Sequence, residues 1–82
     1  MSESRPTPPP LPNVRPGYYR HYKGKEYRVL GVARHTETDE AFVVYQALYG
    51  ERGLWTRPAG LFVGTVMVDG AEVPRFALVM AE

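Results

Sequence analysis

Prolines divide this chain into two unequal parts. Six of its eight prolines lie within the first sixteen residues. A segment with proline at every second or third position favours an extended conformation and cannot bury a core. We therefore predict a flexible Pro-rich tail over residues 1–16 and one small β-barrel domain over residues 17–82. A domain of roughly 65 residues has only a marginally stabilising core, so a homodimer is one expected source of further stability.

Short apolar runs separated by glycine or polar turns make up the second part. They predict strands at residues 17–22, 26–34, 41–48, 54–57, 65–68, 71–73 and 77–80. Residues 41–48 are apolar on both alternating faces, which is typical of a central strand. Asp69-Gly70 indicates a two-residue hairpin, Gly31 a bulge, and residues 59–62 a single helical turn. The pattern predicts an all-β fold: a small antiparallel barrel of five or six short strands with one short helical turn.

Several familiar classes of protein are excluded or disfavoured by what the sequence lacks. It has no cysteine, which excludes disulfides and thiolate zinc sites and favours a cytoplasmic protein. No apolar run approaches the ~20 residues that span a bilayer, so we expect no membrane partner. A P-loop, a Gly-x-Gly-x-x-Gly fingerprint and a Gly-x-Ser-x-Gly elbow are also missing. We assign no catalytic residue and no cofactor, and lean away from an enzyme without excluding one.

Side chains able to hold a metal or to act as acid and base are few: His21, His35, Glu37, Asp39 and Glu40. A catalytic zinc usually needs at least two histidines, or a set of histidines and carboxylates, that converge on one point. The spacing His35-x-Glu37 recurs by chance, and no helical His-x-x-x-His pair accompanies it. We predict no metal site, and a metal-dependent hydrolase around His35 and Glu37 is the second alternative function.

Charge is unevenly distributed along the chain. Residues 1–34 hold seven Lys or Arg against two acids, a balance of +5, whereas residues 35–82 have a balance of −4. The predicted hairpin from Arg20 to Arg34 combines cations with tyrosines, as small barrels that bind single-stranded nucleic acid do. The same rings are also needed to fill a small core. A nucleic-acid-associated barrel using this hairpin is therefore the first alternative function.

The run Leu54-Trp55-Thr56-Arg57-Pro58 is the most distinctive motif. In a strand, Trp55 and Arg57 lie on one face, and a buried guanidinium there needs an acceptor. If this strand pairs antiparallel with residues 41–48, Arg57 returns alongside the start of that strand, near the acidic turn. Two roles are open for Arg57: a structural clamp bound to Glu37, Glu40 or a backbone carbonyl, with Glu40 favoured, and a receptor for an anion.

Several motifs in the second part resemble a known bacterial family. They are Tyr19-Arg20-His21-Tyr22-Lys23-Gly24, Tyr27-x-Val29, His35-Thr36-Glu37-Thr38-x-Glu40, Val44-Tyr45-x-x-Leu48-Tyr49-Gly50, Leu54-Trp55-x-Arg57-Pro58-x-x-x-Phe62 and Val73-Pro74-Arg75-Phe76. In this order and spacing they resemble the domain-of-unknown-function family 1653 (DUF1653). The resemblance implies a short bacterial protein with no established activity and an SH3-like barrel. It also implies recurrent polar positions, at His21, Lys23, Glu37, Glu40, Tyr45, Tyr49, Trp55 and Arg57.

Our leading hypothesis is a non-catalytic binding module, an SH3-like barrel that takes a small anionic or peptide ligand beside Trp55 and Arg57. The expected ligand-binding residues are His21, Lys23, His35, Glu37, Glu40, Tyr45, Tyr49, Trp55 and Arg57. A receptor for a single carboxylate should depend little on salt, whereas binding to a phosphate backbone should weaken steeply as salt rises.

Overall fold

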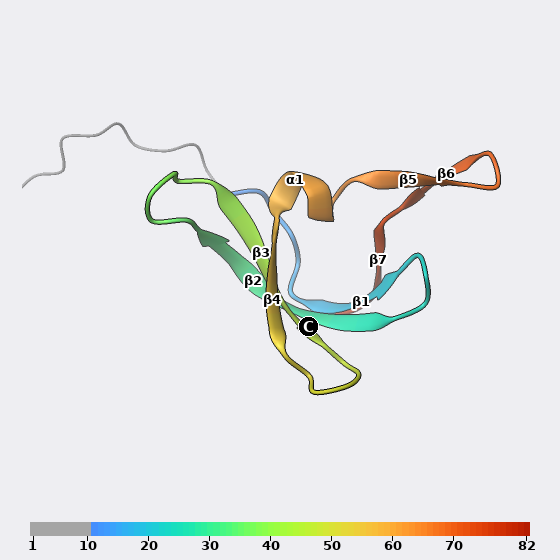
Figure 1. Ribbon diagram of the computed structural model, residues 1–82, viewed down its shortest axis with the longest axis horizontal. Helices are drawn as coiled ribbons and strands as arrows, with labels where there is room; N and C mark the ends of the chain where they lie inside the picture. The colour runs from blue at the N-terminus through green and yellow to red at the C-terminus, as the bar shows by residue number, and fades with distance from the viewer. Residues whose placement is uncertain (1–10) are drawn as a thin grey trace, which may run out of the picture.

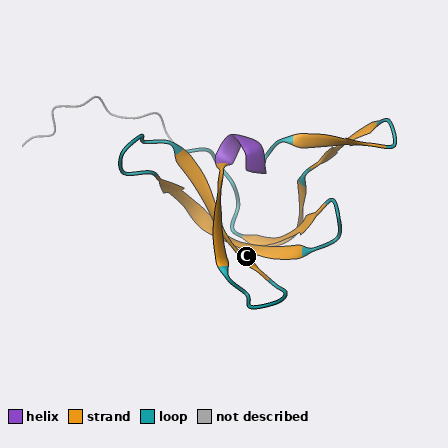
Figure 2. Ribbon diagram, in the orientation of Figure 1, coloured by secondary structure: helices purple, strands orange, loops and turns teal. Residues whose placement is uncertain are grey.

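A computed structural model describes residues 11–82 of the chain. These residues form seven strands and one short helix (Figures 1 and 2). The elements are β1 (Gly17–His21), β2 (Glu26–Arg34), β3 (Ala41–Ala47), β4 (Leu54–Pro58), α1 (Ala59–Phe62), β5 (Thr65–Val68), β6 (Ala71–Pro74) and β7 (Phe76–Ala81). All strand pairs are antiparallel, which confirms the predicted all-β class. Over residues 11–82, no helix is long and apolar enough to cross a membrane.

The strands form two sheets of unequal size. Strands β4, β3, β2, β1 and β7 follow one another in a five-stranded sheet that curls on itself, as Figure 1 shows. Strands β5 and β6 form a separate two-stranded sheet that projects from one side of the molecule. All seven strands correspond to segments predicted above, and the five strands of the main sheet fall within the predicted number because the β5–β6 hairpin stands as a sheet of its own.

Two local predictions about the backbone are confirmed. Asp69 and Gly70 have positive φ values of 52° and 81°, as the two central residues of a type I′ hairpin turn require. The register between β2 and β3 shifts between Val29 and Gly31, so the bulge expected at the glycine is present. A bulge of this kind bends its strand and increases the local twist, which helps the sheet to curl.

The core lies on the inner side of the curled sheet. β3 pairs with β2 on one edge and with β4 on the other, as predicted for a central strand, and its Tyr45 is buried. Phe62 of α1 covers this side, and its ring stacks on Phe76 with centroids 4.2 Å apart. The outer face of β3 is only partly covered: Phe42 and Val44 are half-buried, because α1 packs on the inner face.

The segment before β1 contacts the barrel. Val14 packs against the core, and the carbonyl of Pro16 accepts a hydrogen bond from the backbone N–H of Glu82 at 3.0 Å. Of the Pro-rich tail predicted over residues 1–16, residues 1–10 lie outside the described part of the chain. Val14 and Pro16, which precede the predicted start of the domain, therefore contact the barrel.

Candidate functional site

The register of β3 and β4 places Arg57 on the inner face of the sheet. Arg57 lies opposite Val43, and Trp55 lies opposite Tyr45. Directly opposed residues of an antiparallel pair project to the same face, and Val43 and Tyr45 are both buried in the core. The predicted hairpin geometry is thus confirmed: Arg57 returns alongside the first half of β3.

Arg57 contacts aromatic side chains. Its Nε donates to the Tyr45 hydroxyl at 3.4 Å, and its Cζ lies 5.7 Å from the centroid of the Phe76 ring. Within residues 11–82 it forms no ion pair with Glu37 or Glu40, so the predicted clamp is not formed. The reason is geometric: Arg57 points to the inner face, whereas both glutamates are exposed in a turn closed by the bond from His35 N–H to the Glu40 carbonyl.

His21, at the end of β1, packs on the same aromatic ring as Arg57. Its ring centroid is 4.9 Å from that of Phe76, and its Nδ1 accepts the backbone N–H of Lys23 at 3.1 Å. Burial lowers the pKa of His21, and the charges of Arg57, Arg75 and Lys23 lower it further. The imidazole is therefore neutral near pH 7. With Nδ1 acting as an acceptor, the proton lies on Nε2, which is free to donate.

We call His21, Lys23, Arg57 and Arg75 the cationic cluster. Among residues 11–82, the charges that act on the pKa of His21 are all positive, and no carboxylate contributes. Nearby acids of the barrel are bound elsewhere: Glu26 pairs with Arg20 and Glu82 pairs with Arg28, each at 2.7 Å. The cluster is thus an electropositive site beside an aromatic surface.

Three tyrosines extend that aromatic surface. The ring of Tyr27 lies edge-on to Tyr45 and Tyr49, at centroid distances of 5.3 and 5.5 Å. The hydroxyl oxygens of Tyr27 and Tyr49 are hydrogen-bonded at 2.7 Å, and Nζ of Lys25 lies 4.5 Å from the Tyr49 centroid. Burial, together with the hydrogen bond to Tyr49, raises the pKa of Tyr27 to about 12. The Tyr27 hydroxyl therefore stays protonated at neutral pH.

The structure brings together only some of the residues predicted for the site. His21, Lys23, Tyr45, Tyr49 and Arg57 lie in or beside the cationic cluster. Trp55 shares the inner face with Tyr45 but is 58% exposed on the edge strand β4. Sequence reasoning did not assign Arg75, Phe76 and Tyr27 to the site, although Val73-Pro74-Arg75-Phe76 was among the motifs that carried the family resemblance.

His35, Glu37 and Glu40 lie apart from the cluster. The ring of His35 lies 6.0 Å from that of Phe42, which alternates with Val43 along β3 and so projects to the outer face. Its Nδ1 accepts the backbone N–H of Glu37 at 3.1 Å, a contact that shapes the turn. In the described part of the chain, no three metal-ligating side chains gather at one point.

Comparison with known proteins supplies a family. Residues 17–78 match the sequence model of DUF1653, described as a protein of unknown function. A crystal structure of a DUF1653 protein from Bordetella bronchiseptica is similar, with 46% sequence identity and a TM-score of 0.77. The match covers 85% of this chain and 92% of that chain. No curated protein matches the chain. The matched residues include the whole cationic cluster.

Proposed function

Since the chain belongs to the DUF1653 family, whose function is unknown, we propose that it is a non-catalytic binding module that takes a small anionic ligand at the cationic cluster. The ligand carries a carboxylate or a phosphate, either as a small molecule or on a peptide. We include in this proposal an SH3-like barrel and a location in the bacterial cytoplasm, which suits a chain without cysteine.

One observation carries the proposal: within residues 11–82, Arg57 lies over the ring of Phe76 with no carboxylate bound to it. Arg57 is half-buried, and its one hydrogen bond to a described residue is the 3.4 Å contact with Tyr45. Burying part of a guanidinium without a counter-ion costs free energy. A bound anion would remove that cost, because the two terminal nitrogens of Arg57 can donate to it as a pair.

The other members of the cluster fit the same role. Nε2 of the neutral His21 donates a hydrogen bond and adds no charge that must be desolvated. Lys23 and Arg75 attract an anion through their longer-range field. We place the ligand beside Arg57 and Tyr45 rather than beside Trp55, because Trp55 lies at the exposed edge of the sheet.

Both alternative functions lose part of their basis. In the basic hairpin, Arg20 and Arg28 are bound to carboxylates, and Arg34 donates to the carbonyl of Asp39 at 3.0 Å. These contacts leave the hairpin with less charge to offer a phosphate backbone. For a hydrolase, His35 and Glu37 lie in an exposed turn on the other side of the sheet from Arg57, away from the aromatic surface.

Thermal melting of the full chain tests the proposal. Acetate, phosphate and sulfate are titrated against chloride at constant ionic strength, so that general screening cancels. At 100 times its Kd, a ligand of the native state adds about 2.7 kcal/mol of stability. We expect at least one anion to raise the Tm, and Arg57→Gln to abolish the rise. Arg20→Gln, which removes an exposed arginine outside the cluster, is the matched control and should keep it.

Two results would contradict the proposed function. In the first, none of the three anions raises the Tm of the wild-type protein. In the second, the rise is the same in Arg57→Gln as in Arg20→Gln, which would place the anion outside the cationic cluster.

A further inference from the structure

Strand β7 leaves one edge of the main sheet open. Within residues 11–82 it pairs with β1 alone, so its other side presents unpaired backbone N–H and C=O groups. Its sequence, Phe-Ala-Leu-Val-Met-Ala, holds no charge. Leu78, Val79 and Met80 are 43%, 51% and 61% exposed. Proteins usually protect such edges with charges or proline, and an uncharged apolar edge is a template for another strand.

We propose that β7 pairs antiparallel with β7 of a second copy of this chain, which joins two five-stranded sheets across a twofold axis. This interface adjoins the cationic cluster, since Arg75 lies at its rim and His21 lines the groove beside it, but it goes beyond the proposed function. In a twofold interface each surface must complement itself. The sequence and register of β7 meet that condition at three levels: the faces of its side chains, the charges at its ends and the groove beside it.

On both sides of the central pair, Leu78 and Val79, the faces of the side chains match because of an irregularity in the strand. β1 pairs Tyr18 with Met80 but Tyr19 with Leu78, so Val79 is an extra residue. Ala77 pairs with Arg20. Tyr18 and Arg20 are two residues apart on β1, so they project to the same face of the sheet. Their partners on β7, Met80 and Ala77, therefore project to that face as well. An antiparallel pairing centred between Leu78 and Val79 then sets Ala77 opposite Met80 of the second copy, with both side chains on one face.

Charges at the two ends of β7 complement each other. Arg75 precedes the strand and Glu82 follows it. The same pairing brings Arg75 alongside Glu82 of the second copy, and the twofold axis repeats the contact at the other end. Glu82 already binds Arg28 within its own chain at 2.7 Å and is partly exposed. The second copy's arginine would therefore join an existing ion pair at the rim of the interface.

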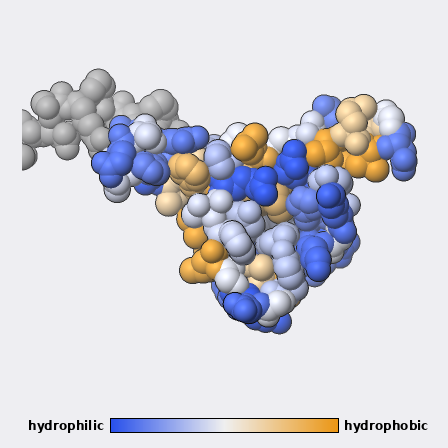
Figure 3. Space-filling view, in the orientation of Figure 1, coloured by the Kyte–Doolittle hydropathy of each residue, from blue (hydrophilic) through white to orange (hydrophobic). Residues whose placement is uncertain are grey.

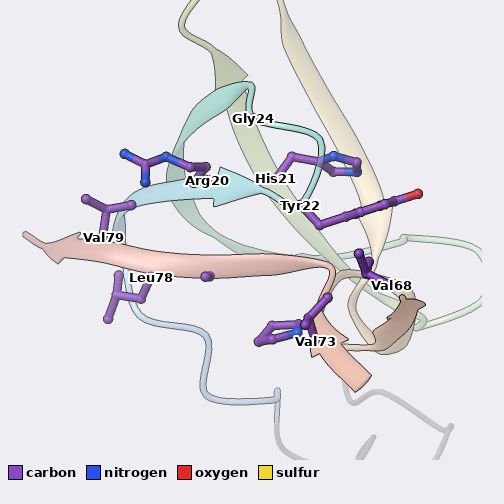
Figure 4. Close-up of a pocket in the computed structure, with 10 residues that line it drawn as sticks. Arg20, His21, Tyr22, Gly24, Val68, Val73, Leu78 and Val79 are labelled. Carbon is purple, nitrogen blue, oxygen red and sulfur yellow. The ribbon is translucent and has the colours of Figure 1, made fainter. Parts of the chain in front are cut away.

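A groove beside the start of β7 offers space for a side chain of the second copy. It has a volume of about 540 Å³, and its apolar wall comes from both sheets: Val68, Val73, Pro74, Ala77, Leu78 and Val79. Figure 4 shows Leu78 and Val79 on opposite sides of β7, with Val68 and Val73 of the β5–β6 hairpin near its start. Because Met80 of the second copy lies opposite Ala77, its long flexible side chain can enter this groove.

The projecting hairpin gains a role from this pairing. Met67 and Val68 at its tip are 68% and 37% exposed, and Figure 3 shows apolar surface gathered there. A two-stranded hairpin has marginal stability on its own in water. A second copy seated between the hairpin and β7 would cover apolar side chains of both, as expected where a small domain exposes a contiguous apolar surface.

Sedimentation velocity of the full chain over a wide concentration range tests the interface. We expect a monomer–dimer equilibrium. Met80→Lys should weaken the dimer at least about tenfold, since it would bury an unpaired charge in the groove. Leu54→Lys is the matched control, because Leu54 is an exposed leucine on the opposite edge strand, β4. It should leave the dimer unchanged.

A second variant keeps the test decisive if Met80→Lys does not fold. Ala77→Lys introduces a charge at the exposed position that faces Met80 of the second copy, and it should weaken the dimer similarly. A wild-type protein that stays monomeric at all concentrations would overturn the proposal. So would a dimer that survives Met80→Lys or Ala77→Lys but dissociates with Leu54→Lys, which would place the interface on β4.

Discussion

The guanidinium of Arg57 lies over the ring of Phe76, with Cζ 5.7 Å from the ring centroid, and this contact joins the two edge strands of the main sheet. Arg57 is on β4 and Phe76 is on β7, which the sheet order places furthest apart. The sheet therefore curls far enough for side chains of its two edge strands to meet across the core. The arginine closes the barrel through an aromatic ring and keeps its terminal nitrogens available to a ligand.

Arg57→Ala should have a small effect on stability. A partly buried ion pair would lose several kcal/mol when one partner is removed, because the other charge is left stranded. Arg57 has an aromatic partner instead, and such a cation–π contact contributes about 0.5–1 kcal/mol at a partly exposed site. We expect urea unfolding to show a loss of about 1 kcal/mol or less. A loss several times larger would mean that Arg57 has a structural counter-ion after all.

Phe76→Ala should be far more damaging than Arg57→Ala. Phe76 is buried, stacks on Phe62 and contacts both Tyr45 and His21. Truncating a buried phenylalanine typically costs about 3–5 kcal/mol, which is a large share of the stability of a small domain. Chemical denaturation should show partial or complete loss of the native state at 25 °C. Trp55→Ala, which truncates a 58% exposed ring, is the control and should cost much less.

Local elements of this fold could be predicted from the sequence because short-range chemistry determines them. Asp69 and Gly70 tolerate positive φ, and the β-branched and aromatic residues of β3 favour a strand. The pairing of β3 with β4 could be predicted because one short turn joins the two strands. Each of these inferences needed only residues that are close together in the chain.

The candidate site could be predicted only in part, because its contacts join distant segments. Arg57 meets Phe76 and Tyr45, and its charge acts on His21, which lies at the opposite end of the domain sequence. No local pattern distinguishes an arginine that faces a ring from one that faces a carboxylate. The expected partner Glu40 was near Arg57 along the hairpin, but the direction of the side chains separated them.

Acidification should destabilise the protein through His21. The pKa of this histidine is lowered in the folded state, so the unfolded chain binds more protons between the folded and unfolded pKa values. Stability therefore rises with pH through that window and is lost as pH falls below the usual histidine pKa of about 6.5. The Tm measured from pH 7.5 down to pH 5.5 should fall less in His21→Gln than in the wild type. Equal slopes in the two proteins would contradict this.

NMR titration of His21 can identify the charges that lower its pKa. Arg57 is the largest of the three electrostatic contributions, after burial itself. Arg57→Gln should raise the pKa of His21 toward its ordinary value, and Lys23→Gln should raise it less. His35, which lies on the outer face, is the internal control in the same spectra and should not respond. A shift of His35 equal to that of His21 would indicate a general change in the fold.

Truncation from the N-terminus should leave the fold intact up to Asn13 and damage it beyond. Val14 packs against the core, and the carbonyls of Arg15 and Pro16 accept hydrogen bonds from the Tyr19 hydroxyl and the Glu82 N–H. Removing residues 1–13 should shift the Tm by no more than a few degrees. Removing residues 1–16 should lower it clearly further. Equal Tm values for the two truncations would show that the contacts of residues 14–16 contribute nothing to stability.

Gly17→Ala should be among the most damaging single substitutions in the barrel. Gly17 begins β1 with φ at +149°, and a Cβ placed there would lie 2.5 Å from the carbonyl oxygen of Met80 and 2.8 Å from Cα of Ala81. Both obstacles are backbone atoms of β7, so they cannot move aside without breaking the β1–β7 pairing. The same strand end is anchored by the bond from Glu82 N–H to the Pro16 carbonyl.

Gly31→Ala is the matched control for this prediction. Gly31 also lies in a strand of the main sheet, but nothing lies within 4 Å of its added Cβ. The φ of Gly31 lies outside the positive range that strains L-amino acids. Alanine there should be neutral or slightly stabilising, because it lowers the conformational entropy of the unfolded chain. We expect Gly17→Ala to lower the unfolding free energy by several kcal/mol, as strain at a special backbone position does. Similar melting temperatures for the two variants would mean that β1 and β7 approach less closely than the structure shows.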